Sequence, residues 1–507
     1  MSALRFGMLG ARPEHVSLLG RLAIHALRES GAELVAWVEG EDEPALPWNL
    51  HQPGALPGAA AIPRGVAENV DFLLLLGDFR PSRELLEHPR YGVWRFATPN
   101  PAPLAFWDVY DGLYHVEVRL DRLTLDSERC IPLDRRWVRV DRGSYRRTLQ
   151  AVVEEMAEMP AYAGRGPLDR PPAAVAFPRP LTQTPSAADL WQLNAKLILR
   201  AAGEQCRGLL FSEAWQVGVV EDSIASFVEA DLPPSVRWLP SPGGNRYLAD
   251  PFVARTGGGW LLMAEDFDFS ENRGKIVQEF SPDGSFTGHT LDAHLHLAGE
   301  AIHMSYPFLF SHGGEIYCAP ETHQKKGVEA WRWNEPSRTW QDPREILPGV
   351  ACIDPTLVFF ENRWWLFFTD KADGVDSKLR VCFADSPFGP WQAHARDPVK
   401  SDVRSSRPGG APFVHRGKLY RPAQDSSKHY GWRLAINQVT RLSPEEFEEE
   451  TVFVMDSHRL GASGIHTLSG ASGKTLLDAR RWRFTPWLTP RRLRHKLRKL
   501  LSLAGRS

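Results

Sequence analysis

Two kinds of hydrophobic pattern divide the chain. In the first part, short apolar runs alternate with stretches of helical periodicity. The runs are residues 4–10, 33–38 and 72–77, and one helical stretch covers residues 15–30. Strands that are apolar along their whole length are buried on both faces, as in a parallel sheet covered by helices. We therefore expect an α/β domain of Rossmann-like type over residues 1–158.

A proline-rich stretch follows this domain. Residues 159–185 include seven prolines between Pro160 and Pro185. Proline removes backbone donors and stiffens the chain, so this stretch is interpreted as a linker. Ser186 and Asp189 then have the spacing of a helix-capping box, which predicts a helix from there to about Cys206.

The pattern from residue 186 to residue 487 is one of repeated strands. Five related segments recur at intervals of about 50 residues: 249–253, 305–309, 353–357, 410–414 and 464–468. Each is followed by a tight turn, a second apolar strand and a polar residue. Hairpins that return to a common axis are typical of a propeller, so we predict an all-β five-bladed β-propeller over residues 186–487. A long β-sandwich is the alternative, although sandwiches do not repeat one motif at this interval.

Acidic residues occupy matched places in these repeats. Asp250 and Asp354 each precede a proline in the first and third repeats, and Glu321 ends the second strand of the second repeat. Paired carboxylates can protonate a leaving oxygen and activate a nucleophile, which is the chemistry of glycosidic bonds. We therefore predict Asp250, Glu321 and Asp354 as catalytic residues. The alternative is that each Asp-Pro pair is only a turn feature.

Further polar side chains at equivalent positions are candidates for substrate binding. They are Glu265, Ser305, Tyr306, Arg407, Gln424, Asp425 and His466. An arginine can fork onto a carboxylate or phosphate of a substrate, or form a salt bridge between blades. His466 is interpreted as a ligand of a sugar hydroxyl or as a core histidine. Most of the eighteen tryptophans lie in the repeats and are expected to be core.

Charge and cysteine content narrow the classes of partner. The net charge is −2, and the five cysteines are scattered without CxxC spacing. Gly7 and Gly10 lack the third glycine of a dinucleotide-binding fingerprint. We expect no cofactor, no metal and no nucleic-acid partner. Neither an export signal nor a long apolar run is apparent, so a cytoplasmic location is expected.

The positive charge is concentrated at the C-terminus. Residues 491–507 contain seven Lys or Arg and no acid, and four leucines, Leu493, Leu497, Leu500 and Leu501, fall on one helical face. Residues 488–507 are therefore predicted to form a basic amphipathic helix that binds an anionic membrane surface peripherally. A disordered tail, or a helix packed on the propeller, is the alternative.

The repeat motifs resemble one family in particular. The motifs are residues 249–252, 305–308 with 320–322, 353–356 with 364–367, 407–410 and 421–425. They resemble the N-terminal domain of glucosamine inositolphosphorylceramide transferases, a propeller similar to those of arabinanases, levansucrases and invertases. The resemblance covers about residues 209–482. It implies a sugar or glycolipid substrate, although the plant members carry a separate glycosyltransferase domain that this chain lacks.

The first domain more faintly resembles the N-terminal fold of formyltransferases. Residues 92–99 stand where that family has an Asn-x-His-Pro-Ser motif, with Arg95 at the asparagine position and Ala97 at the histidine position. Asp126 is a match for the family's aspartate. Without the asparagine and histidine, formyl transfer loses its oxyanion donor and its proton shuttle. We therefore expect a degenerate domain that serves binding or assembly.

Three functions remain open on the sequence. The first is glycosyl transfer in the biosynthesis of a cell-surface glycan or glycolipid, which the acids, the N-terminal domain and the basic tail favour. The second is hydrolysis of glycosides by the same acids. The third is a non-catalytic module that binds a sugar.

Overall fold

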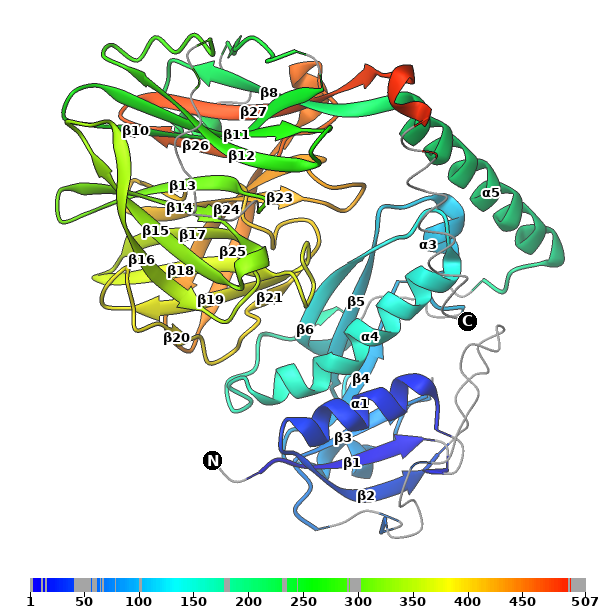
Figure 1. Ribbon diagram of the computed structural model, residues 1–507. Coiled ribbons are helices and arrows are strands. Elements are labelled where there is room, and N and C mark those ends of the chain that lie inside the picture. Colours follow the sequence, from blue (N-terminus) through cyan, green and yellow to red (C-terminus); the bar gives the residue numbers. More distant parts are fainter. Residues whose placement is uncertain are drawn as a thin grey trace. The chain divides into compact units, whose positions relative to one another are not determined.

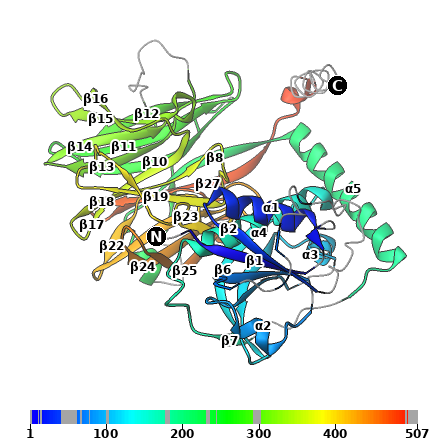
Figure 2. The ribbon, with the colours of Figure 1, turned by 90° about the horizontal axis from the view of Figure 1, so that it is seen from below.

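The computed structural model divides the chain into two compact units, Met1–Ala201 and Ala202–Ser507 (Figures 1 and 2). It describes residues 3–490 and Leu493, apart from residues 11, 14–15, 41–55, 57–61, 64, 66–67, 78, 100–102, 177–182, 230–234, 244, 290 and 292–301. The basic helix predicted over residues 488–507 lies outside the described residues, except for residues 488–490 and Leu493. Among the helices it describes, none combines the length and the apolar character that crossing a membrane requires.

The first unit contains a seven-stranded sheet of order β2-β1-β3-β4-β5-β6-β7. Its strands are β1 Arg5–Gly10, β2 Glu33–Glu39, β3 Phe72–Leu76, β4 Val93–Ala97, β5 His115–Leu123, β6 Arg129–Arg139 and β7 Val175–Ala176. Its helices are α1 Leu18–Glu29, α2 Arg83–Glu87, α3 Phe106–Asp111 and α4 Tyr145–Gly164, and α5 Ala187–Leu210 continues into the second unit.

The sheet is mixed, which corrects the expectation of a parallel sheet. Strands β1, β2, β3 and β4 pair in parallel, whereas β5, β6 and β7 are added in antiparallel pairing. The continuous apolar runs all lie in the parallel half. In β5, buried Val116, Val118 and Leu120 alternate with more exposed residues, as in antiparallel strands with one buried face.

Both faces of the parallel half are covered. The larger core contains Phe72 and Trp94, whose stacked rings have centroids 3.7 Å apart, and residues of α1 and α4. A smaller core on the other face contains Leu73 and Leu75, with Leu85 of α2 packed against it. These features agree with an α/β domain. The relationship to formyltransferases remains a prediction.

Helix α5 begins at the predicted capping box. The hydroxyl of Ser186 accepts from the backbone N–H of Asp189 at 3.2 Å, and the Asp189 carboxylate accepts from the backbone N–H of Ser186 at 2.8 Å. These reciprocal bonds satisfy N–H groups that a helix start leaves without partners. The helix ends at Leu210, slightly later than the sequence indicates.

The second unit is a five-bladed β-propeller, as the repeats predict (Figure 1). The first blade consists of β10 Arg246–Arg255, β11 Trp260–Asp268 and β12 Arg273–Ser281, and the second of β13 Ser305–His312, β14 Glu315–Glu321, β15 Gly327–Asn334 and β16 Thr339–Pro348. The third blade consists of β17 Cys352–Phe360, β18 Arg363–Asp370, β19 Lys378–Ala384, β20 Gln392–Ala393 and β21 Lys400–Ser401. The fourth blade consists of β22 Phe413–His415, β23 Lys418–Asp425, β24 Arg433–Leu442 and β25 Phe447–Asp456. Short helices are α6 Ser226–Glu229, η3 His323–Lys325, η4 Ser457–Leu460 and η5 Pro486–Leu488.

The fifth blade closes the ring with strands from both ends of the unit. It has the order β26-β27-β8-β9, in which β26 Leu468–Ala471 and β27 Lys474–Phe484 pair with β8 Phe211–Val220 and β9 Arg237–Trp238. The register of β27 on β8 runs without interruption from Thr475 opposite Val220 to Phe484 opposite Phe211. Because β8 precedes the first blade, this pairing joins the last blade to the first.

The hairpin turns explain why four of the five repeats fold alike. In four blades the two residues between the first and second strands both have positive φ, namely Gly313-Gly314, Glu361-Asn362, Arg416-Gly417 and Ser472-Gly473. Turns of this type match the right-handed twist of the flanking strands. Each first strand is thereby returned as a second strand, which brings the polar end of the hairpin back towards the axis.

Candidate active site

The first strands of three blades share an unusual bend at the predicted positions. Strands β10, β13 and β17 each shift register around an X-Pro pair, where Asp250, Tyr306 and Asp354 have φ values of 49°, 46° and 51°. Positive φ is uncommon for residues other than glycine and is retained only where the surroundings impose it. The Asp-Pro pairs are therefore bulges inside strands, and the alternative of a simple turn does not describe them.

Backbone N–H groups at these bulges donate to carboxylates of neighbouring blades. Asp250 N donates to Asp478 at 3.0 Å, Tyr306 N donates to Asp250 at 3.2 Å, and Asp354 N donates to Glu321 at 3.3 Å. The bonds link the fifth blade to the first, the first to the second and the second to the third. The acids therefore surround the axis and also hold the blades together.

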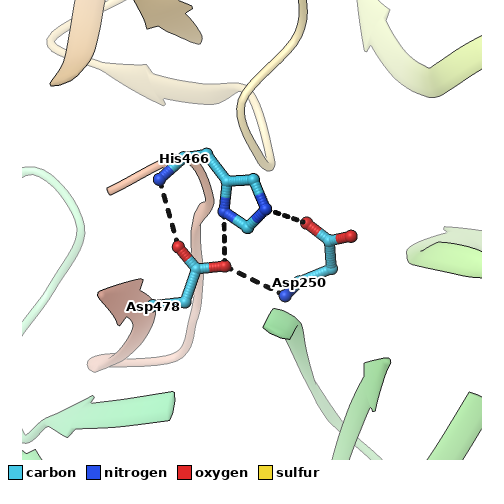
Figure 3. A group of neighbouring side chains, drawn as sticks. All are labelled: Asp250, His466 and Asp478. Carbon is cyan, nitrogen blue, oxygen red and sulfur yellow. Dashed lines mark hydrogen bonds and ion pairs between the residues drawn. The ribbon is translucent and has the colours of Figure 1, made fainter. Parts of the chain in front are cut away.

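His466 lies between two of these carboxylates (Figure 3). Its Nδ1 is 2.7 Å from Asp478 and its Nε2 is 3.5 Å from Asp250. The ring is stacked on Trp215 with centroids 3.8 Å apart. Burial alone would lower the pKa of His466, but the charges of Asp478 and Asp250 outweigh it and raise the pKa. His466 is therefore a buried partner of the acids, whichever role it has towards a substrate.

The same three residues are the group most suited to a metal ion in the described part of the chain. Asp250, His466 and Asp478 each offer one ligand atom, and these atoms lie within 4.8 Å of one another. Carboxylate oxygen and imidazole nitrogen suit several divalent cations. The hydrogen bonds already described also connect the three side chains without a metal.

Asp354 is held by the fourth blade. Arg407 Nε donates to Asp354 Oδ2 at 2.7 Å, and Gln424 Nε2 donates to the same oxygen at 2.8 Å. Arg407 also donates to Asp376 and lies over the ring of Tyr430. Burial raises the pKa of Asp354 well above its usual range despite the opposing charge of Arg407. The salt bridge between blades, one of the two roles considered for Arg407, is present.

Glu321 has the opposite electrostatic character. Its carboxylate is 2.8 Å from Nδ1 of His323 and also accepts from Asp354 N. Burial would raise the pKa of Glu321, but the hydrogen bond to His323 and the charge of Arg407 together hold it below its usual range. Glu321 is therefore ionised at neutral pH.

The carboxylate of Glu265 has fewer hydrogen-bond partners in the protein than those of Asp250, Glu321 and Asp354. No residue in the described part of the chain donates a hydrogen bond to its carboxylate, whose nearest basic neighbour is Nε2 of His303 at 3.8 Å. Gly274 N donates to Nδ1 of His303 at 2.8 Å, so the ring's proton is on Nε2, which faces Glu265. Burial, reinforced by Asp250 and Glu321, raises the pKa of Glu265 well above its usual range.

The remaining predicted residues are less central. The hydroxyl of Tyr306 is buried between Thr356 Oγ1 at 2.8 Å and the backbone of Gly410, so its contacts are between blades. Ser305 is buried opposite Glu321 in the β13–β14 pair. The carboxylate of Asp425 accepts from Ser427 in the turn that follows it, within its own blade.

Residues that the sequence did not single out complete the site. Asp478 lies within β27, the second strand of the fifth blade, and its place in the repeat was the one available signal. Thr467 belongs to the same blade as Asp478, and its hydroxyl donates to Asp250 at 2.7 Å. His303 and His323 flank the second blade's motif, but nothing in the repeat pattern marks either histidine.

Comparison with known proteins shows that the propeller segment matches one family. Residues 240–488 match the family described as glucosamine inositolphosphorylceramide transferase 1, N-terminal. The propeller resembles the N-terminal domain of these transferases. The protein of that name from Oryza sativa subsp. japonica is 34% identical over 220 residues, and the one from Arabidopsis thaliana is 32% identical over 257 residues.

The alignments cover 42% and 49% of this chain, but only 29% and 32% of the rice and Arabidopsis proteins. Among solved structures, an exo-β-1,3-galactanase from Clostridium thermocellum has a TM-score of 0.33 at 11% identity, covering 42% of this chain and 52% of its own. A family 117 glycoside hydrolase from Zobellia galactanivorans has a TM-score of 0.35 at 12% identity, covering 54% and 91%.

Proposed function

We propose that the propeller binds a sugar at its axis and transfers a glycosyl group in the synthesis of a glycan or glycolipid. The observation that carries this proposal is the contrast between two buried carboxyls: His323 is 2.8 Å from Glu321, whereas the imidazole beside Glu265, that of His303, is 3.8 Å away. The pKa of Glu265 is raised and that of Glu321 is lowered. Environments that separate the pKa values of two carboxyls in this way supply a protonated acid and an ionised group at the same pH.

The two carboxyls divide the chemistry between them. Protonated Glu265 would donate its proton to the oxygen that leaves the anomeric carbon. The resulting carboxylate would then take the proton of the acceptor hydroxyl as the oxygen of that hydroxyl bonds to the same carbon. Ionised Glu321 would stabilise the positive charge that develops on the sugar ring. Asp250 and Asp354 hold the bulged strands and add negative potential around the same centre. This proposal differs from the expectation based on the sequence. There, Asp250 and Asp354 were catalytic together with Glu321, and Glu265 bound substrate.

Transfer is preferred to hydrolysis because of the relatives. The rice and Arabidopsis proteins are named as glucosamine inositolphosphorylceramide transferases, and the matched segment is the propeller. A sugar or glycolipid is therefore the class of substrate that we propose for this chain. The matched segment is less than a third of each relative, so the specific donor and acceptor are not carried over.

A non-catalytic sugar-binding module is the second candidate. It is favoured by how fully Asp354 and Asp250 are used within the protein. Asp354 accepts from Arg407 and Gln424, and the side chains of Asp250 and Asp354 are only 6% and 2% exposed. Carboxylates so placed stabilise a propeller whether or not a reaction takes place.

The test uses the full chain with two sets of substrates. Nucleotide-activated and lipid-linked sugars are supplied with an acceptor, and oligosaccharides are supplied alone, with products followed by mass spectrometry. We expect transfer from an activated donor, and loss of turnover in Glu265→Gln. Glu450→Gln, on an exposed strand position of the fourth blade, is the matched control.

The outcomes separate the candidates. Release of free sugar from oligosaccharides, without transfer, would replace the transferase by a hydrolase. Saturable sugar binding with no turnover of either set would favour the binding module. Unchanged turnover in Glu265→Gln, or an equal loss in Glu450→Gln, would remove Glu265 from the reaction.

A further inference from the structure

A tyrosine of the fourth blade lies at the acid-lined end of the propeller axis. Tyr430 belongs to the loop between β23, which ends at Asp425, and β24, which begins at Arg433. The loop leaves β23 directly after Gln424 and Asp425, and the side chain of Gln424 donates to Asp354. Tyr430 is half-buried and was not among the residues that the sequence marked. Its place beside the acids makes it a candidate for contact with a ligand.

Contacts with the fifth blade fix the backbone of this loop. Ile465 N donates to the carbonyl of Gly431 at 2.9 Å, and the side chain of Arg480 donates to the carbonyl of Tyr430 at 3.2 Å. Gly431 has a φ of 60°, and a Cβ there would lie 2.8 Å from the indole of Trp215. Only glycine allows so close an approach in this conformation. The position of Tyr430 is therefore set by the protein itself.

The ring of Tyr430 is held by two residues of the acidic cluster. The guanidinium of Arg407 lies over the ring, 4.7 Å from its centroid, and the imidazole of His466 meets it edge-on with centroids 5.3 Å apart. A cation over the face of an aromatic ring is a favourable contact. Arg407 is paired with Asp354, and His466 lies beside Asp250. The ring thus stands between the groups that accompany these two acids.

The hydroxyl of Tyr430, in contrast to its ring, has no partner among the residues that the structure describes. The hydroxyl of Tyr306 differs, because it is bonded to Thr356 and to the backbone of Gly410. Burial raises the pKa of Tyr430 well above its usual range, although the charge of Arg407 opposes this. The phenol therefore keeps its proton at neutral pH and is available to donate a hydrogen bond.

We propose that the hydroxyl of Tyr430 donates a hydrogen bond to one hydroxyl of the sugar at the axis and so selects sugars that carry it. The inference rests on the proposed function, because it needs a sugar to lie among the acids. Ionised carboxylates only accept hydrogen bonds, whereas each sugar hydroxyl also needs a donor. Arg407 and Gln424 are donors near the axis, but both are bonded to Asp354. Tyr430 supplies a donor that is not already used.

The experiment is calorimetric titration of the full chain with methyl glycosides of the common monosaccharides, and then with the monodeoxy derivatives of the one that binds. Tyr430→Phe should weaken binding of that glycoside roughly tenfold. Its melting temperature should not change, because no described group loses a hydrogen bond. One deoxy derivative should bind the unmodified protein as weakly, and Tyr430→Phe should weaken it no further, because the same bond cannot be lost twice.

The matched control is Tyr420→Phe, near the start of β23, where the ring is stacked on Phe413 and no described residue hydrogen-bonds the hydroxyl. It should bind like the unmodified protein. Equal binding by Tyr430→Phe and Tyr420→Phe would overturn the inference and leave the proposed function standing. The same holds if Tyr430→Phe weakens every deoxy derivative by one common factor. If the unmodified protein binds none of the glycosides, the proposed function fails and the inference fails with it.

Discussion

The carboxylate of Asp478 accepts a hydrogen bond from the backbone N–H of Asp250 at 3.0 Å, where the last blade of the propeller meets the first. Asp478 also accepts from the backbone N–H groups of His466 and Thr467 at 3.1 Å each. One fully buried side chain thus connects the ends of a ring that the chain must close. The acid best placed for stability was not among the acids that the sequence marked for catalysis.

The variant Asp478→Asn should destabilise the propeller strongly. An amide keeps one acceptor oxygen and turns a donor towards groups that already donate, and it removes the nearer of the two carboxylates beside His466. Breaking a buried ion pair in this way costs about 3–5 kcal/mol. The measurement is urea unfolding of the full chain. Asp342→Asn, which affects an exposed pair with Arg332, should cost less than about 1 kcal/mol; equal losses in the two variants would refute the role given to Asp478.

The variant Glu265→Gln should stabilise the protein at alkaline pH while it removes activity. Because the pKa of Glu265 is raised on folding, its contribution is fully present below the unfolded pKa of about 4.3 and is lost as pH rises through the folded pKa. Glutamine mimics the protonated form and escapes this loss. Melting temperatures at pH 6 and pH 9 should therefore differ less in the variant than in the parent. The idea fails if the parent and the variant lose the same number of degrees between the two pH values.

The variant His323→Phe should move the acidic limb of the pH–rate profile to higher pH. His323 lowers the pKa of Glu321, and a carboxylate with a depressed pKa keeps its contribution above the unfolded value and loses it as pH falls through the folded value. Without the imidazole, Glu321 should take up its proton at higher pH. The profile of kcat/KM measures this. His458→Phe, at an exposed position, is the control and should leave the limb in place.

The variant Tyr306→Phe should cost about 1–3 kcal/mol of stability, because it leaves the buried backbone N–H of Gly410 without its acceptor. Tyr317→Phe removes a hydroxyl from the same blade to which no described residue hydrogen-bonds, and should cost much less. Urea unfolding compares the two. A sugar-binding role for the Tyr306 hydroxyl predicts something different, namely a loss of sugar affinity with stability unchanged.

The N-terminal unit should produce no formylated product from a folate donor with any amino sugar. Arg95 and Ala97 both lie in β4, and we expect them to stand where the formyltransferase motif carries its asparagine and histidine. A methyl group cannot relay a proton, and a guanidinium would repel an amine in its charged form. Mass spectrometry of the amino sugars after incubation measures this. Formylation at enzymatic rates would show that another histidine, such as His115, replaces the missing one.

Much of the propeller could be predicted because its information is local and repeated. In four of the five blades the first two strands are joined by two residues with positive φ, and the glycine or asparagine at these turns is visible in the sequence. The capping box at Ser186 is local in the same way. The matched Asp-Pro pairs indicated where the axis lies, because equivalent strands of a propeller meet there.

The tertiary structure alone decided how the surroundings of the four acids differ. Asp250 and Asp354 look alike in the sequence, yet one contacts His466 and the other Arg407. Glu265 and Glu321 also lie in equivalent strands, but His323 is hydrogen-bonded to Glu321, and no residue in the described part of the chain donates to the carboxylate of Glu265. A pKa depends on burial and on charges brought together from distant segments, and a pattern along the chain contains neither. The mixed sheet of the first unit follows the same rule, since pairing direction depends on which strands become neighbours. The residues of the propeller were thus apparent from the sequence, whereas their charge states were set by the folded environment.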